Sequence, residues 1–182
     1  MKISLIEIEN KSKSIINLGK QLYAISTNLF HFDLLIIAAL NRTVNTNKAF
    51  VSLVKDSNFI SAIPLIRINI DTLLRLYASK ISEFNRNEYA LKILSGTEVK
   101  KMKHYNSKSK LSDYFLHTEI SKIEGMEWVS HLYNIGNSFI HFEKSHFLSS
   151  MKITSEDDRT ISMSIGYHDS FISDNDKKEL VN

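Results

Sequence analysis

The chain of 182 residues has no cysteine, a single proline and only five glycines. Without cysteine there is no disulfide framework, no thiolate metal site and no thiol nucleophile, and a reducing compartment such as the cytoplasm is expected. The scarcity of proline and glycine argues against an all-β fold, which needs many tight turns, and against glycine-rich nucleotide-binding loops. The composition therefore favours a mostly helical protein.

Long hydrophobic runs are also missing. The longest uncharged apolar run, residues 34–40, is far shorter than the roughly 20 residues that cross a membrane, and Glu7 interrupts the first apolar stretch. We expect a protein that is neither embedded in a membrane nor secreted by a classical signal. With 43% hydrophobic and 24% charged residues, the chain can bury one core, so residues 1–182 are predicted to form a single domain.

Apolar residues recur at helical spacing along most of the chain, which predicts a bundle core over residues 1–148. The predicted helices cover residues 12–30, a segment from 34–40 of uncertain end, 49–54, 61–82, 88–94, 111–120 and 126–142. The helix over residues 61–82 is apolar on almost every side, which is typical of a helix in the middle of a bundle.

The spacing of apolar residues changes in residues 149–182. Apolar side chains alternate with serines over residues 161–165, and residues 151–154 can pair with them across a polar turn, which predicts a β-hairpin. Ser173 and Asp176 resemble a capping box that starts a short terminal helix. The predicted fold class is an all-α helical bundle with a small C-terminal β-hairpin.

Three charged residues interrupt the apolar helix predicted over residues 61–82. Arg67, Asp71 and Arg75 follow one another at i, i+4 and i+8 and so share one face of the helix. Burying charges without partners costs several kcal/mol. The excess positive charge therefore needs a carboxylate such as Glu83 or Glu88, or an anionic ligand such as a phosphate. Two interpretations follow, a buried ionic lock between helices or a catalytic site.

A second polar stripe lies on the late helix, where Tyr133, Asn137 and His141 repeat the same spacing. If the two stripes face each other, guanidinium groups, a carboxylate, an imidazole and a phenol converge, as acid–base chemistry on a phosphate requires. A histidine that is hydrogen-bonded within the core is the alternative. His146 follows five residues later, which is not the spacing of two zinc ligands on one helix face. It joins Tyr133 and Asn137 as a candidate binding residue, and no metal or cofactor is predicted.

Residues 92–110 contain six lysines and a single acidic residue, Glu98. Lysines interspersed with His104 and Tyr105 can contact a phosphate backbone. The same segment is rich in serine and asparagine, which is typical of a solvated surface loop. Nucleic-acid contact and a solvated loop both stay open for this segment.

The motifs of both stripes, with the hairpin that follows them, resemble those of uncharacterised bacterial helical proteins related to the HEPN superfamily. The resemblance covers about residues 29–172 and rests on Pro64-Leu65-Ile66-Arg67, Ile70-Asp71, Arg75, the segment from Tyr133 to Phe142 and Ser164-Ile165-Gly166. HEPN domains are helical bundles, often dimeric, and their catalytic members are metal-independent ribonucleases of toxin–antitoxin and phage-defence systems. Their motif is an arginine, four to six residues, and then a histidine.

The resemblance implies two alternative functions. His141 matches the motif histidine, but Asn134, Ile135 and Gly136 stand where the arginine would be. The first function is therefore a non-catalytic or weakly active module that binds RNA, a nucleotide or a protein partner in a bacterial defence or stress setting. The second is an endoribonuclease toxin in which His141 acts with Arg67 or Arg75. A cytoplasmic homodimer is expected in either case.

Overall fold

The computed structural model describes residues 2–25, 28–155, 157, 159–169 and 171–172. Within these residues the chain forms seven α-helices, one short 3-10 helix and a two-stranded antiparallel hairpin, which confirms the predicted fold class. None of the helices described is both long and apolar enough to cross a membrane.

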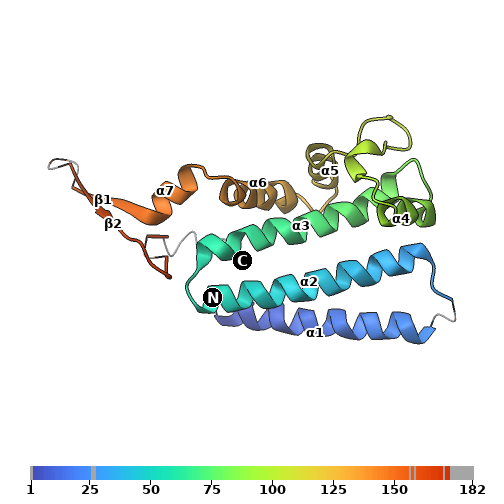
Figure 1. Cartoon of the computed structure of the whole chain (residues 1–182), viewed down its shortest axis with the longest axis horizontal. Helices are drawn as coiled ribbons and strands as arrows, with labels where there is room; N and C mark the ends of the chain where they lie inside the picture. The colour runs from blue at the N-terminus through green and yellow to red at the C-terminus, as the bar shows by residue number, and fades with distance from the viewer. Residues whose placement is uncertain (1, 26–27, 156, 158, 170, 173–182) are drawn as a thin grey trace.

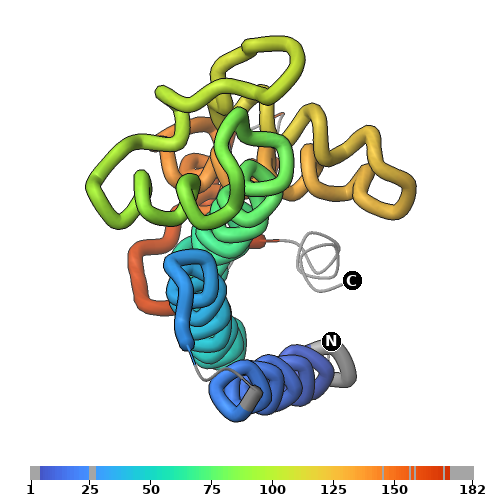
Figure 2. Tube along the Cα trace, turned by 90° about the vertical axis from the view of Figure 1, so that its right-hand side faces the viewer, coloured from blue at the N-terminus to red at the C-terminus, as the bar shows by residue number. Residues whose placement is uncertain are grey.

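Three long helices form the base of the bundle. They are α1 (Lys2–Ile25), α2 (His31–Lys55) and α3 (Phe59–Ile81). The helix α2 lies between the other two, and Figure 2 shows α1 at the edge of the molecule on the far side of α2 from α3. The shorter elements that follow are α4 (Arg86–Leu94), the 3-10 helix η1 (Val99–Lys101), α5 (Asp113–Ile120), α6 (Trp128–Ile140) and α7 (Lys144–Ser150).

The helix α3 is central because α2 covers one of its sides and α6 runs antiparallel along the other (Figure 1). It contributes to two clusters of buried apolar side chains. One surrounds Leu74 and includes side chains of α4, α5 and α6, whereas the other surrounds Ile63 and joins α3 to α2 and to Leu5 of α1. Each Val, Leu, Ile, Phe or Met side chain among them stabilises the fold by about 1.5–3 kcal/mol when it is fully buried.

The helix α2 differs from its prediction because one continuous helix replaces the two expected over residues 34–40 and 49–54. The intervening polar side chains bond back within the helix, since Asn45 Nδ2 donates to the Asn41 carbonyl and Thr46 Oγ1 to the Arg42 carbonyl, both at 2.8 Å. The residues predicted to break the helix are instead accommodated by it, and packing against α1 and α3 outweighs their weak helix propensity.

The starts of α1 and α3 also differ from their predictions. The helix α1 begins at Lys2 rather than at residue 12. The helix α3 begins at Phe59, because Asn58 acts as the N-cap and its side chain accepts a hydrogen bond from the Ser61 N–H at 3.2 Å. The helix therefore starts two residues before the predicted residue 61, and Pro64 lies in its second turn.

The hairpin consists of β1 (Met151–Ser155) and β2 (Thr160–Met163). Met151 pairs with Met163 and Ile153 with Ile161, so the predicted pairing across a polar turn is confirmed. The helix α7, which the sequence did not predict, leads into β1, and together α7 and the hairpin project beyond the ends of the long helices (Figure 1). We call residues 144–167 the arm.

The chain returns from the arm to the corner between α2 and α3. Asp169 donates its backbone N–H to the Ser57 carbonyl at 3.0 Å, and its carboxylate accepts the Ile60 N–H at 2.7 Å. Asp169 therefore satisfies a backbone donor in the first turn of α3, where a carboxylate is favourable. The predicted terminal helix at Ser173 lies outside the described residues.

Candidate functional site

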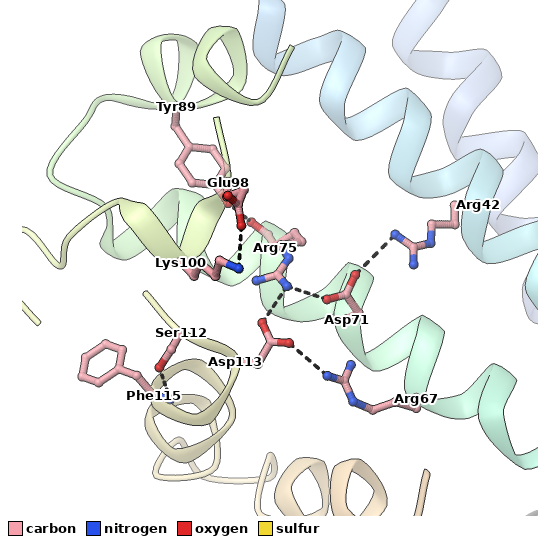
Figure 3. Close-up of polar contacts among 10 residues, drawn as sticks. All are labelled: Arg42, Arg67, Asp71, Arg75, Tyr89, Glu98, Lys100, Ser112, Asp113 and Phe115. Atoms are coloured by element: carbon pink, nitrogen blue, oxygen red, sulfur yellow. Dashed lines mark hydrogen bonds and ion pairs between the residues drawn. The ribbon is translucent and has the colours of Figure 1, made fainter. Parts of the chain in front are cut away.

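Arg67, Asp71 and Arg75 lie on one side of α3, as their spacing predicts, and two residues from other helices join them (Figure 3). Arg67 Nη2 is 3.1 Å from Asp113 Oδ2, and Arg75 Nη2 is 2.6 Å from Asp113 Oδ1. Arg75 Nη2 also lies 2.8 Å from Asp71 Oδ1, and Arg42 Nη1 lies 3.4 Å from Asp71 Oδ2. The five side chains form an alternating series, Arg67–Asp113–Arg75–Asp71–Arg42, which we call the charge cluster.

The carboxylate that balances the stripe is Asp113 rather than the suggested Glu83 or Glu88. Glu88 completes the capping box of α4 with Asn85, and Glu83 accepts a backbone N–H from residue 103. Asp113 is the first residue of α5, directly after the N-cap Ser112. Because α5 packs on α3, this cap places the carboxylate between the two arginines.

The Arg67 end of the charge cluster is closed. The Arg67 side chain is only 9% exposed, and its guanidinium carbon lies 3.9 Å from the centre of the Tyr133 ring, a cation–π contact with α6. Gly136, one turn further along α6, permits this approach, since a Cβ there would lie 2.6 Å from the Cβ of Arg67. The glycine at this position is therefore required for α6 to cover Arg67.

Beyond Arg67 the contacts continue into α5. The Tyr133 ring stacks on His117 with centroids 4.2 Å apart, and His117 Nδ1 lies 2.8 Å from Ser130 Oγ. Burial lowers the pKa of His117, and the positive charge of Arg67 lowers it further. Burial and Arg67 therefore disfavour a positive charge on His117, which packs within the closed end.

The Arg42 end of the charge cluster is open. The Arg42 side chain is 47% exposed and reaches Asp71 only at 3.4 Å. A cavity of about 280 Å³ adjoins it, between α2, α3, α4 and η1. Its polar lining comes from Arg42, Asp71, Thr72, Arg75 and Thr97, and most of the remainder is apolar.

The charges within the cluster do not cancel, because three guanidinium groups face two carboxylates. Burial opposes the charge of Arg75, but Asp71 and Asp113 outweigh this effect and raise its pKa. Arg75 Nη1 and Arg67 Nε are buried and have no hydrogen-bond partner among the described residues. The cluster therefore carries one excess positive charge.

Of the second predicted stripe, only Tyr133 reaches the charge cluster. The helix α6 ends at Ile140, so His141 is an exposed residue with an extended backbone. Because Gly136 lies opposite Arg67 on an antiparallel helix, His141 is about 20 Å from Arg75 along the helix axes. The Arg67 side chain extends toward Asp113, the carboxylate that it shares with Arg75 (Figure 3).

No hydrogen bond or ion pair joins Asn137 or His146 to the charge cluster among the residues that the structure describes. Asn137 is half-buried on α6, and its carbonyl accepts the backbone N–H of His141 at 3.2 Å. His146 lies on α7 with ring centroids 5.7 Å from Phe139 and 5.3 Å from Phe142, and its Nδ1 has no partner in the described part of the chain. These two predicted binding residues do not join the arginines.

The arm exposes large apolar side chains. Met151, Ile153, Ile161 and Met163 share one face of the hairpin, because residues directly opposite in an antiparallel pair point to the same side. Ile153, Ile161 and Met163 are exposed by 51–69%. The sequence predicted the hairpin. Alternating apolar and polar residues usually indicate a face that packs on a core, but this apolar face is uncovered within the described residues.

The basic segment is mostly solvent-exposed and partly neutralised. Lys100 and Lys101 each lie 2.6 Å from Glu98, and their hydrogen bonds hold the pKa of Glu98 at about 2. Tyr105 is exposed and packs beside the half-buried His104. Both interpretations of this segment, phosphate contact and solvated loop, remain predictions.

The chain matches none of the protein-family models, curated proteins or solved structures with which it was compared. The relationship to the HEPN superfamily consequently remains a prediction from the sequence motifs.

Proposed function

We propose that the chain is a non-catalytic helical module that assembles through its arm, first of all with a second copy of itself. In this proposal the charge cluster orients α3, α5 and α6, and the arm supplies the binding surface. The defence or stress setting implied by the HEPN resemblance is part of the same proposal. The observation that carries it is the uncovered apolar face of the hairpin.

An isolated two-stranded hairpin is only marginally stable in water, and its unpaired edges favour further association. Single exposed apolar residues are ordinary, but the arm gathers many of them, including Leu148 on α7 (57% exposed) and Tyr167 at its end (92%). A stable interface buries roughly 800 Å² per partner, and the exposed apolar side chains of the arm contribute to that area. A covering partner would remove this surface from water.

A second copy suits this face because the face has no charge. The residues that share it, Met151, Ile153, Ile161 and Met163, are all neutral, whereas Lys152 lies on the opposite side. Two identical charged faces would repel each other, but two neutral apolar faces can pack around a two-fold axis.

The arrangement of the arginines favours binding over ribonuclease chemistry. A guanidinium that stabilises a phosphorane must be free to reach the phosphate. Arg67 is instead held by Asp113 and covered by Tyr133, and Arg75 bonds two carboxylates. No contact joins His141 to either arginine among the residues that the structure describes.

Sedimentation velocity over about 1–100 µM protein tests the assembly. We expect a dimer for the wild type, a monomer for Ile161→Glu and a dimer for the control Ser162→Glu, which places the same charge on the other face, opposite Lys152. Circular dichroism should show equal helix content in all three. A wild type that stays monomeric, or a dimer that survives Ile161→Glu, would contradict the proposal.

The ribonuclease alternative is tested separately by incubating the wild type with RNA between about pH 6 and pH 8. We expect intact RNA. If the wild type cleaved RNA and His141→Ala did not, the ribonuclease function would be supported in place of the binding module.

A further inference from the structure

The open end of the charge cluster combines three features that the closed end lacks. It has a cavity of about 280 Å³, a half-exposed guanidinium at the cavity wall, and an apolar lining from α2, α3, α4 and η1. At the closed end the last cation, Arg67, contacts the face of an aromatic ring. At the open end the last cation, Arg42, has only its 3.4 Å contact with Asp71 among the described residues.

The charge series shows what would complete this end. Each carboxylate is shared between two arginines, so the series begins and ends on a cation. Asp71 already bonds Arg75 at 2.8 Å and leaves Arg42 with the longer contact. One further negative charge beside Arg42 would continue the alternation and balance the single excess positive charge. A dianion would leave the region net negative next to two carboxylates.

The walls of the cavity indicate the remainder of the ligand. Leu35, Leu76, Ile93 and Val99 line it, and they favour an apolar body. The volume lies just below the roughly 300–1,000 Å³ of ordinary small-molecule sites, which excludes a dinucleotide or an oligonucleotide. The hydroxyl group of Thr72 is already bonded to the Ile68 carbonyl, so Arg42 is the natural partner for a charged head group.

We propose that this cavity binds a small organic monocarboxylate, with its carboxylate on Arg42 and its apolar body against α3 and α4. Guanidinium and carboxylate groups form short, charge-assisted hydrogen bonds, often in pairs. The site depends on the charge cluster and not on the arm, so it goes beyond the proposed assembly and either can fail without the other.

Hexanoate is a suitable probe because it combines one carboxylate with a short apolar chain. Titration calorimetry and thermal unfolding should give saturable binding and a rise in melting temperature with hexanoate. Neutral 1-hexanol should bind at least tenfold more weakly, since it lacks the charge that Arg42 would bond. Inorganic phosphate should bind more weakly as well, because it lacks the apolar body and carries more than one charge.

Three variants locate the site. Arg42→Gln should weaken hexanoate binding at least tenfold, and Thr97→Met, which fills the cavity without removing a charge, should weaken it similarly. The control is Arg86→Gln on α4, because Arg86 lies over Phe32 and does not line the cavity. It should leave the affinity unchanged.

The proposal is overturned if hexanoate does not bind saturably, or if Arg42→Gln binds it as well as Arg86→Gln does. It is also overturned if hexanol binds as well as hexanoate, or if phosphate binds more tightly than both. Without ligand, the same variants should have the sedimentation coefficient of the wild type. A change in hexanoate binding can then be distinguished from a change in assembly through the arm.

Discussion

The two ends of the charge cluster present the same guanidinium group in opposite surroundings. Arg67 is 9% exposed, lies under α6 and bonds a carboxylate at 3.1 Å, whereas Arg42 is 47% exposed and borders a cavity. At the closed end the surrounding packing fixes the charge, so its loss is expected to affect folding. At the open end the charge is half exposed, so its loss is expected to affect binding more than stability.

The strongest test of the closed end is Gly136→Ala. The added Cβ would lie 2.6 Å from the Arg67 Cβ and 3.2 Å from its backbone N and Cα, so α6 must move away from α3. We expect a loss of about 2–4 kcal/mol in the free energy of unfolding, measured by urea denaturation.

Gly19→Ala on α1 is the matched control, because its nearest neighbour would lie at an ordinary 3.8 Å. That change should be neutral or stabilise the helix by up to about 1 kcal/mol. Equal stability changes in the two variants would mean that the approach of α6 to Arg67 does not depend on glycine.

Asp113→Asn should have the next largest effect. It removes the carboxylate shared by Arg67 and Arg75, so Arg67 loses its only ion pair among the described residues and Arg75 keeps only Asp71. Because the Asp113 side chain is one-third exposed, we expect a loss of about 2 kcal/mol rather than the 3–5 kcal/mol of a fully buried pair. Urea denaturation again provides the measurement.

The comparison variant for Asp113→Asn comes from the open end of the cluster. Arg42→Gln breaks an ion pair that is half exposed and long, so its effect should stay below about 0.5 kcal/mol. If Arg42→Gln destabilised the protein as much as Asp113→Asn, the distinction between the two ends would be lost.

The smallest expected effect is a pH dependence that belongs to the closed end alone. Burial and the charge of Arg67 hold the pKa of His117 below its ordinary value of about 6.5. As the pH falls below that value the unfolded chain binds a proton that the folded chain does not, so stability decreases. Melting temperatures between about pH 5 and pH 7 should show a shallower decrease in His117→Gln than in the wild type.

His131→Gln provides the control for this experiment, because His131 is an exposed residue of the same helix that carries Tyr133. It should keep the wild-type pH dependence. If the melting temperature of His117→Gln depended on pH as steeply as that of the wild type, the pH dependence would come from other groups.

The sequence predicted the features that depend on local spacing. The stripe of Arg67, Asp71 and Arg75 follows from helical geometry, and the pairing of β1 with β2 follows from alternation. The central position of α3 follows from its apolar surface. Each of these requires only residues that are close in the chain.

The features that the sequence did not predict depend on contacts between residues that are far apart in the chain. Asp113 lies 38 residues from Arg75, and nothing in its own segment distinguishes it from the other carboxylates. Arg42 lies between the helices predicted over residues 34–40 and 49–54, where the end of the first was uncertain, and this hid its position opposite Asp71. The sequence also placed His141 within the long helix, but α6 ends one residue earlier.

The return of the chain at Asp169 gives the arm a second attachment. The arm leaves the bundle after α6 and is tied back to the first turn of α3 through the Ile60 N–H. Mechanically it is a loop clamped at both ends rather than a tether with one free end. A load applied at the hairpin is therefore transmitted to the start of the central helix, the same helix that carries Arg67, Asp71 and Arg75.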